Sequence, residues 1–226
     1  MAVDDDTLFR TVREKLFTAV IGDVMDAGGL TRQFLPHAIR ALQPDMVVVG
    51  RAMTVLEADC AGEQVGHSGR PEPFGLMFKA LDQLRMGEVY VAAGGSLRYA
   101  FWGGLMSTRA KSLGASGAVL GGPHRDTREI LGLGLPVFST GPYAQDQRLR
   151  GRVVDYRCAV EFDNAAVVRD GDLIVGDLDG VLVVPAEHVE DVIAGAVTKV
   201  EGEERVREMI GRGMNTEAIF AETGIM

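Results

Sequence analysis

The sequence predicts an α/β fold, because strands and helices alternate along the middle of the chain. Hydrophobic residues make up 46% of the 226 residues and the mean hydropathy is +0.09, as in an ordinary folded domain. Short apolar runs, typical of buried strands, alternate with segments of helical periodicity, which favours parallel pairing of at least some strands. The predicted elements of this part are strands at Glu88–Ala93, Gly117–Leu120 and Leu135–Ser139, and helices at 104–113 and from about Asp126.

The N-terminal part predicts two helices within residues 5–29. Asp6 or Thr7 is expected to cap the first helix and Thr18 the second, because short polar side chains accept hydrogen bonds from free amides at helix starts. The glycine pair at 28–29 ends the second helix. Three elements are predicted between these helices and the alternating part: a valine-rich strand at 46–57, a Gly- and Pro-rich loop at 60–75 and a short helix at 76–84.

The last third predicts short strands followed by a long amphipathic helix. Val153–Ile174 contains short β segments, and Val175–Val184 predicts a hairpin around a turn with Asp179-Gly180. Because the sequence holds no linker, low-complexity tract or internal repeat, we expect a single domain over residues 1–226 with terminal helices. The final helix begins near Glu187, and its apolar stripe consists of Val189, Val192, Ile193, Ala196, Val197 and Val200.

Charge and composition argue against several classes of function. Asp and Glu number 32 against 23 for Lys and Arg, the net charge is −9, and no basic run occurs, which disfavours direct nucleic-acid binding. Four lysines leave few candidates for Schiff-base chemistry. Cys60 and Cys158 lie 98 positions apart, which fits reduced thiols and no zinc pattern. Acidic residues 4–6 stand where a signal peptide would be basic, and no apolar run approaches the ~18 residues of a membrane span, so we expect a cytoplasmic protein without membrane contact.

The most informative stretch begins with the sequence WGGLM at residues 102–106, immediately before a predicted helix. The first amides of a helix have no intrahelical acceptor, and the helix dipole favours negative charge at this end. Two glycines there let a ligand approach the backbone. This segment therefore predicts a site for a small anion.

The same stretch continues with Arg125-Asp126, which follows a predicted strand that ends in Gly121-Gly122. Ligands of α/β proteins bind at such strand ends. Arginine can bind a carboxylate or polarise a carbonyl, and aspartate can hold a hard cation, so the pair predicts a small anionic substrate and a divalent metal. The alternative is a surface ion pair beside a turn, since a second Arg-Asp dipeptide occurs at 169–170.

The order and spacing of WGGLM, GAVLGG and RDTRE resemble the RraA-like family, which includes regulators of ribonuclease activity and class II 4-hydroxy-4-methyl-2-oxoglutarate aldolases. The family pattern is a glycine, about twenty residues, and Arg-Asp-x-x-Glu/Asp. Gly104, twenty intervening residues, Arg125, Asp126 and Glu129 match it. The resemblance runs from residues 18–19 to the last helix, and it implies a swivelling β/β/α domain, an αββα-type sandwich.

The resemblance also implies a role for each motif residue. Arg125 would be the catalytic residue, binding the keto oxygen of the substrate and stabilising the developing enolate. Asp126 would ligate Mg²⁺ or Mn²⁺. The backbone amides that would cradle the pyruvyl carboxylate belong to Gly103, Gly104, Leu105 and Met106.

The resemblance further implies a homotrimer or homohexamer with the site at a subunit boundary. The helical segment 187–222 is expected to pack on a neighbouring subunit, and a glutamate from it would complete the metal environment. Glu203 is the first candidate, with Glu201 and Glu204 as alternatives. Glu203 and Glu204 continue the apolar stripe beyond Val200, where a carboxylate needs a partner. The alternative is a frayed helix end with solvent-exposed glutamates.

Two departures from the family pattern bear on catalysis. Many members carry an acidic residue where this chain has Gly104, and Asp where it has Gly121. The first departure removes a carboxylate that could position a water or move a proton. His124 is a candidate replacement as general acid or base, and the alternative is a turn residue beside a proline.

These observations predict a divalent-metal-dependent carbon–carbon lyase. It would act by retro-aldol cleavage or decarboxylation on a pyruvyl-containing 2-keto acid such as 4-hydroxy-4-methyl-2-oxoglutarate or oxaloacetate. The alternative function is a non-enzymatic RraA-like regulator that binds a ribonuclease or helicase through its acidic surface. Loops 60–75 and 141–150 are expected to recognise the rest of the substrate, and the candidates for binding a second carboxylate are Arg70, Arg98, Tyr143 and Arg148.

Overall fold

A mixed eight-stranded sheet forms the centre of the computed structural model, which describes residues 4–63, 65–66 and 69–225. The strands follow the order β1-β5-β4-β3-β2-β9-β10, and β6 pairs with β2 beside this path. A separate two-stranded sheet joins β7 (Val160–Glu161) to β8 (Val167–Val168). The strands of the large sheet are β1 (Arg40–Ala41), β2 (Val48–Asp59), β3 (Glu88–Ala93), β4 (Gly117–Leu120), β5 (Val137–Ser139), β6 (Gly151–Tyr156), β9 (Leu173–Asp177) and β10 (Gly180–Val184).

Strands β2 to β5 pair in parallel, and the remaining neighbours pair antiparallel. The long strand β2 changes partners along its length: its first half pairs with β9, and its second half pairs with β6 across an irregularity at Leu56/Glu57. Strands β3 and β4 are buried on both faces, as expected for the middle of a parallel sheet. The carboxyl ends of β3, β4 and β5 therefore lie side by side at one edge.

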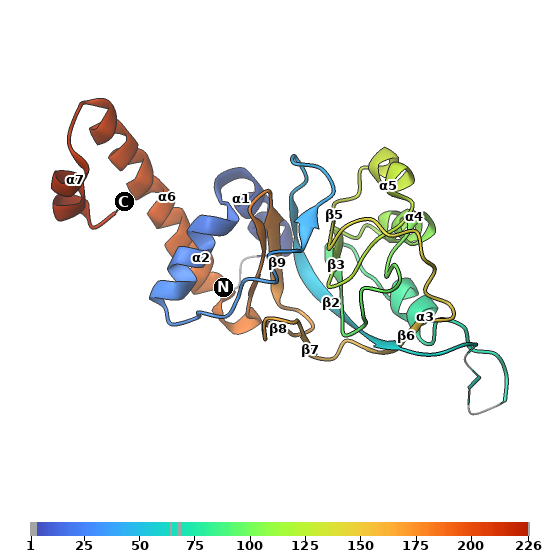
Figure 1. Ribbon diagram of the computed structural model, residues 1–226. Helices are drawn as coiled ribbons and strands as arrows, with labels where there is room; N and C mark the ends of the chain where they lie inside the picture. The colour runs from blue at the N-terminus through green and yellow to red at the C-terminus, as the bar shows by residue number, and fades with distance from the viewer. Residues whose placement is uncertain (1–3, 64, 67–68, 226) are drawn as a thin grey trace.

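Helices cover the sheet in two groups (Figure 1). On one side lie α3 (Met77–Asp82), α4 (Gly104–Ser112) and α5 (Thr127–Leu133), whose apolar residues share a core with those of β2, β3 and β4. On the other side lie α1 (Asp5–Lys15), α2 (Thr18–Ala27) and α6 (Val189–Gly211), which pack on β9 and β10. The first group borders the predicted site.

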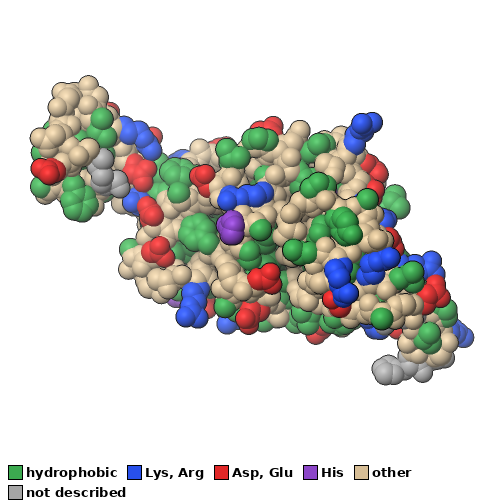
Figure 2. Space-filling model, in the orientation of Figure 1, with side chains coloured by type: hydrophobic (Ala, Val, Ile, Leu, Met, Phe, Trp, Pro, Cys, Tyr) green, Lys and Arg blue, Asp and Glu red, His purple; other side chains and the backbone are tan. Residues whose placement is uncertain are grey.

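The C-terminal arm, which we define as residues 200–225, stands clear of the body (Figures 1 and 2). It consists of the last turns of α6 and the whole of α7 (Thr216–Thr223). The two helices pack against each other. Val206 and Ile219 are buried in this arm, whereas Phe220 is 57% exposed. The first half of α6 contributes its apolar stripe to the body, so that only its second half extends outward.

The structure confirms the α/β prediction and corrects some local details. Asp4, not Asp6 or Thr7, caps α1 by accepting from the amide of Thr7 at 3.0 Å. Thr18 is the first helical residue of α2, and its amide and hydroxyl both donate to Asp177 at 2.7 Å. Asp177, at the end of β9, thus accepts the hydrogen bonds at the start of α2, where a local cap was expected.

Two further details differ from the predictions. The hairpin of β9 and β10 turns through residues 178–179, because Gly180 already pairs with Asp177. Strand β1 was not predicted, since its two residues become a strand only by pairing with β5. No helix among the described residues is both long and apolar enough to cross a membrane.

Candidate active site

The predicted site lies where the parallel strands end. The chain after β3, β4 and β5 continues the parallel pairing, with bridges from Trp102 to His124 and from His124 to Pro142. The amide of Arg125 donates to the carbonyl of Trp102 at 2.9 Å, and the amide of Tyr143 donates to that of His124 at 2.7 Å. Three segments that are distant in sequence are therefore held at fixed spacing around Arg125.

The start of α4 forms one wall of this site. Gly103 is extended and precedes Gly104, the first helical residue. The indole of Trp102 is buried and donates to the hydroxyl of Ser107 at 2.6 Å, which fixes the first turn. Leu105 and Met106 follow in this turn, where a helix offers its amides no intrahelical acceptor. This turn contains the four residues predicted to form an anion cradle.

Asp126 is directed toward α4 and not along its own helix. It precedes α5 with a left-handed backbone (φ 61°), a strained conformation for a residue with a Cβ, and its side chain does not cap α5. Its carboxylate instead accepts from the amide of Gly104 at 3.0 Å. A Cβ at Gly103 would lie 2.7 Å from the same carboxylate. In the predicted cradle, the amide of Gly104 therefore already donates a hydrogen bond to Asp126.

Arg125 lies between two carboxylates. Its Nη1 donates to Asp146 at 2.7 Å, and its Nε lies 3.6 Å from Asp126. The Arg125 side chain is 39% exposed, so the guanidinium is anchored and still accessible to a ligand. Asp146 fixes the position of the predicted catalytic residue.

Glu129 occupies the space beside Gly104. A Cβ built at residue 104 would overlap the Glu129 carboxylate. The amide of Glu129 donates to the carbonyl of Asp126 at 2.9 Å, which closes the first turn of α5. A carboxylate therefore reaches Gly104 from the neighbouring helix, although residue 104 itself has no side chain.

A pocket of about 320 Å³ joins these groups, within the usual range of small-molecule sites. Arg125 is its one positively charged residue among those described, and Asp126 and Asp146 are its negative ones. The remaining lining is mostly apolar and comes from α3, α4 and the segments around them: Phe74, Met77, Phe78, Leu81, Ala100, Phe101, Trp102, Gly103, Leu105, Met106 and Gln147.

A buried carboxyl lies behind the pocket. Gln147 lines the pocket and donates from Nε2 to Glu57 Oε2 at 2.6 Å. Glu57 is 1% exposed, its Oε1 has no partner, and burial raises the pKa of its carboxyl to about 8. The hydroxyls of Tyr90 and Tyr99 are also buried without partners.

His124 does not face the pocket. It is 2% exposed, and both ring nitrogens lie within hydrogen-bonding distance of hydroxyls, Nδ1 2.7 Å from Ser139 and Nε2 2.9 Å from Thr127. Burial lowers the pKa of the imidazole, which favours its neutral form. The geometry fits a residue that ties the ends of β4 and β5 to α5, a role different from the general acid or base and from the turn residue considered from sequence.

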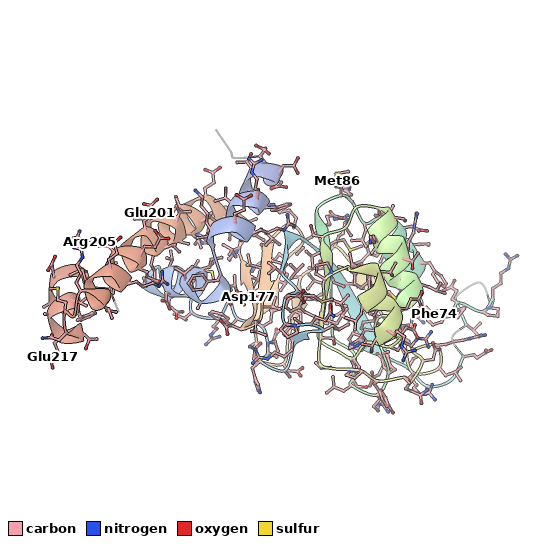
Figure 3. The ribbon with its side chains drawn as sticks, turned by 90° about the horizontal axis from the view of Figure 1, so that it is seen from above. Phe74, Met86, Asp177, Glu201, Arg205 and Glu217 are labelled. Carbon is pink, nitrogen blue, oxygen red and sulfur yellow. The ribbon has the colours of Figure 1, made fainter. Side chains whose placement is uncertain are left out.

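The glutamates of the C-terminal arm lie at the opposite end of the molecule from the pocket. Figure 3 shows Glu201 and Arg205 there, while Phe74 of the pocket lies at the other end. Glu203, between them on α6, lies 3.1 Å from Arg207 and 3.7 Å from Lys199, and its side chain is 21% exposed. Glu201 and Glu204 are exposed. Within one chain these residues are not brought together with Asp126, so their predicted role depends on a second copy.

Comparison with known proteins identifies the fold family. Residues 18–183 match the family described as RraA-like, Aldolase/RraA. The chain belongs to the RraA-like family. It is 32% identical over 207 residues to a protein of Halalkalibacterium halodurans named "Putative 4-hydroxy-4-methyl-2-oxoglutarate aldolase", covering 91% of this chain and 88% of that protein. It is also 36% identical over 133 residues to the uncharacterized protein MJ0644 of Methanocaldococcus jannaschii.

The second match covers 58% of this chain and 62% of MJ0644. Among solved structures, the Streptomyces coelicolor protein RraAS2, described as an unusual member of the RNase ES inhibitor RraA family, superposes with a TM-score of 0.75. That match covers 92% of this chain and 98% of RraAS2 at 23% identity, so it supports the fold alone.

The donor set of this RraA-like site suits a hard cation that keeps much of its water. No group of three or more His, Cys, Asp or Glu side chains that could hold a metal occurs in the described part of the chain. Mg²⁺ is commonly bound by one or two carboxylates together with water and substrate oxygens. The Asp126 carboxylate is 42% exposed at the pocket, and Glu129 lies against the adjacent Gly104. These residues fit such a cation.

Three groups of site residues in this RraA-like chain were not predicted from the sequence: Asp146 and Gln147, the buried Glu57, and the apolar residues of α3. The expected contacts from loop 141–150 were Tyr143 and Arg148. The available signal was that this loop follows β5, whose end lies beside that of β4. Glu57 gave no local signal, because its partner Gln147 is 90 positions away.

Proposed function

We propose that this chain is a carbon–carbon lyase that acts on a 2-keto acid and produces the enolate of pyruvate. The observation that carries the proposal is the convergence of Arg125, the Asp126 carboxylate and the first turn of α4 on one pocket. The similarity to the protein named an aldolase supports the same class of reaction. The regulator alternative has the support of the shared fold.

The pyruvyl carboxylate would bind at the first turn of α4. The amides of Leu105 and Met106 and the positive end of the helix dipole attract an anion there. Gly103, without a side chain, leaves this approach open. The Asp126 carboxylate already holds the Gly104 amide, so it sets the edge of the cradle and limits the orientation of the ligand.

Arg125 would bind the keto oxygen. In retro-aldol cleavage, a base takes the proton of the C4 hydroxyl and the C3–C4 bond breaks. Its electron pair forms the new C2–C3 double bond while the π pair of the keto group moves onto the C2 oxygen, and a proton then adds to C3. In oxaloacetate decarboxylation the same electron flow occurs as the C3–C4 bond breaks and carbon dioxide leaves. The guanidinium stabilises the charge that develops on the C2 oxygen, and Asp146 holds it in place.

Asp126, and Glu129 beside Gly104, would hold Mg²⁺ or Mn²⁺. When bound, the cation would supply Lewis-acid polarisation of the keto oxygen. Glu203 of a second copy, in a homotrimer or homohexamer, remains the proposed further ligand, with Glu201 and Glu204 as alternatives. Glu203 lies on α6 between Glu201 and Arg205, which Figure 3 labels on the outward-facing arm, and this position supports a contact between copies.

The test is pyruvate release from oxaloacetate with Mg²⁺ or Mn²⁺, with and without EDTA. We expect metal-dependent turnover that Arg125→Ala lowers by at least about a hundredfold, since preorganised charge stabilisation contributes that much in comparable sites. Arg51→Ala is the matched control, because Arg51 pairs with Asp5 of α1 at 2.7 Å and neither residue lines the pocket. Absence of metal-dependent turnover, or full activity in Arg125→Ala, would show that the proposal is wrong.

A further inference from the structure

We propose that the lyase pocket takes 4-hydroxy-2-oxo acids whose C4 carries an uncharged, apolar alkyl or aryl group. This inference rests on the proposed function and concerns the half of the substrate beyond the pyruvyl unit. It differs from the expectation, drawn from the sequence, that loop arginines bind a second carboxylate.

One part of the pocket lining is an apolar wall. Phe74, Met77, Phe78 and Leu81 form it, from α3 and the residues before it. The rings of Phe74 and Phe78 meet edge to face, with centroids 5.6 Å apart and planes at 71°. Phe78 is 54% exposed although it borders the pocket, so its ring offers free apolar surface to a ligand. An apolar substituent would cover this surface.

The backbone holds this wall in position. Phe74 has a left-handed conformation (φ 68°), unusual for a bulky residue, and Gly75 follows with φ 60°. Backbone hydrogen bonds with Val153 of β6 fix both sides of this turn, at 2.9 and 3.1 Å. An ion pair between Asp82 and Arg109, at 2.9 Å, ties α3 to α4. The aromatic wall is therefore part of the rigid site.

The charges at the pocket do not favour a second carboxylate. Arg125 is the one described cation in the lining, and Asp146 and Asp126 already lie beside it. A substrate carboxylate against the apolar residues of α3 that line the pocket would lose hydration without a positive partner among these described residues. The pyruvyl carboxylate has the first turn of α4, so the single anionic group of a monocarboxylate is accommodated.

The arginines predicted to bind a second carboxylate are engaged or lie elsewhere. Arg98 pairs with Asp59 at 2.6 Å and Arg148 with Glu63 at 2.8 Å. Neither arginine lines the pocket that holds Arg125, and Arg70 is exposed on the 60–75 loop. Tyr143 lines a second, smaller hollow together with Arg125 and Asp126, and does not line the pocket that contains the aromatic wall.

The proposed reaction needs no co-reactant. The proton removed from the C4 hydroxyl is balanced by the proton that adds to C3, and the electron pair of the C3–C4 bond becomes that of the enolate. The products are pyruvate and an apolar aldehyde or ketone. A reaction that oxidises or reduces such a carbonyl compound would consume the second product.

The experiment compares cleavage of 4-hydroxy-2-oxo-4-phenylbutanoate and of 4-hydroxy-4-methyl-2-oxoglutarate by the full chain with Mg²⁺ or Mn²⁺. Pyruvate release is the readout, with one pyruvate counted per turnover of the phenyl compound and two per turnover of the dicarboxylate. We expect kcat/KM for the phenyl compound to be at least about tenfold higher, since apolar pocket contacts discriminate by roughly 10- to 200-fold. Phe78→Arg places a cation in the wall and should lower this ratio at least about tenfold. Phe34→Arg, the same change at a phenylalanine that is 43% exposed between α2 and β1 and does not line this pocket, should leave the ratio unchanged.

Oxaloacetate decarboxylation, measured in parallel, separates the two proposals. If oxaloacetate reacts and the dicarboxylate is cleaved as well as or better than the phenyl compound, or neither is cleaved, the apolar specificity is wrong and the lyase proposal stands. If none of the three substrates reacts, the proposed function itself fails. If Phe78→Arg changes the assembly mass in light scattering but not the ratio, the wall is a contact between copies and the specificity inference is overturned.

Discussion

The buried carboxyl behind the pocket leads to a prediction about stability. The pKa of Glu57 is raised from 4.5 to about 8 by burial, with Gln147 as its one hydrogen-bond partner. Between these two pH values the folded protein keeps a proton on Glu57 that the unfolded chain releases. Unfolding therefore releases a proton in this window, and the free energy of unfolding contributed by Glu57 falls as the pH rises. Glu57→Gln removes this dependence with little change in side-chain shape.

The magnitude follows from the two pKa values. One pKa unit corresponds to about 1.4 kcal/mol, and titration of the folded state flattens the dependence near pH 8. Between about pH 6 and pH 8 we expect Glu57→Gln to gain roughly 2 kcal/mol relative to the parent, or about 4–8 °C in Tm for a chain of this size. The substitution also changes the hydrogen bond to Gln147, which shifts the free energy of unfolding by the same amount at every pH. This shift does not affect the slope of the stability difference against pH.

The assay is urea unfolding followed by circular dichroism at about pH 6, 7 and 8, for the parent and the variant, with thermal melts in the same buffers. Glu14→Gln, the same substitution at an exposed position on α1, is the matched control. We expect a slope in the stability difference for Glu57→Gln and none for Glu14→Gln. A flat difference across the three pH values for Glu57→Gln would refute the reasoning, because Glu57 would then be ionised in the folded state throughout.

Three further predictions concern the site and the arm. Asp146→Asn should lower kcat at least about tenfold with unchanged circular dichroism, because it removes the charged acceptor that holds Arg125, and steady-state kinetics measure this. Gly104→Ala should displace the Glu129 carboxylate and weaken Mn²⁺ binding about tenfold or more, as measured by titration calorimetry. Equal Mn²⁺ affinity of the parent and the variant would contradict a contact between Glu129 and the metal. Asn215→Ala removes the cap that accepts from the Ala218 amide at 2.9 Å, and should cost α7 about 1 kcal/mol, seen as roughly fivefold faster hydrogen exchange in α7 alone.

The fold was predictable where local sequence and burial agree. Strands β3 and β4 have the bounds predicted for them, because both are short apolar runs that end in glycine pairs and lie in the middle of the sheet. The alternation of these strands with α4 and α5 also predicted their parallel pairing. Strand β1 and the contact of Thr18 with Asp177 were not predictable, since each depends on a partner more than ninety positions away.

The site was predictable to a similar degree. Arg125 and Asp126 were located because a strand end before a helix start is a recurrent ligand site, and the structure brings both to the pocket. Asp146, which positions Arg125, was not located, because it lies in a loop without periodicity or a motif. The apolar wall was missed because Met77 and Leu81 have the spacing of an ordinary helix core.

The space beside Gly104 changes how the family pattern applies to this chain. From sequence, a glycine in place of an acidic residue indicates a lost carboxylate and a weakened catalyst. In the structure the Glu129 carboxylate lies against Gly104, where a Cβ would overlap it. The absence of a side chain at 104 is thus the condition for Glu129 to reach this place. The presence of a carboxylate at a site is decided by which side chains converge there, so a substitution at one position of a motif does not by itself argue against the lyase proposal.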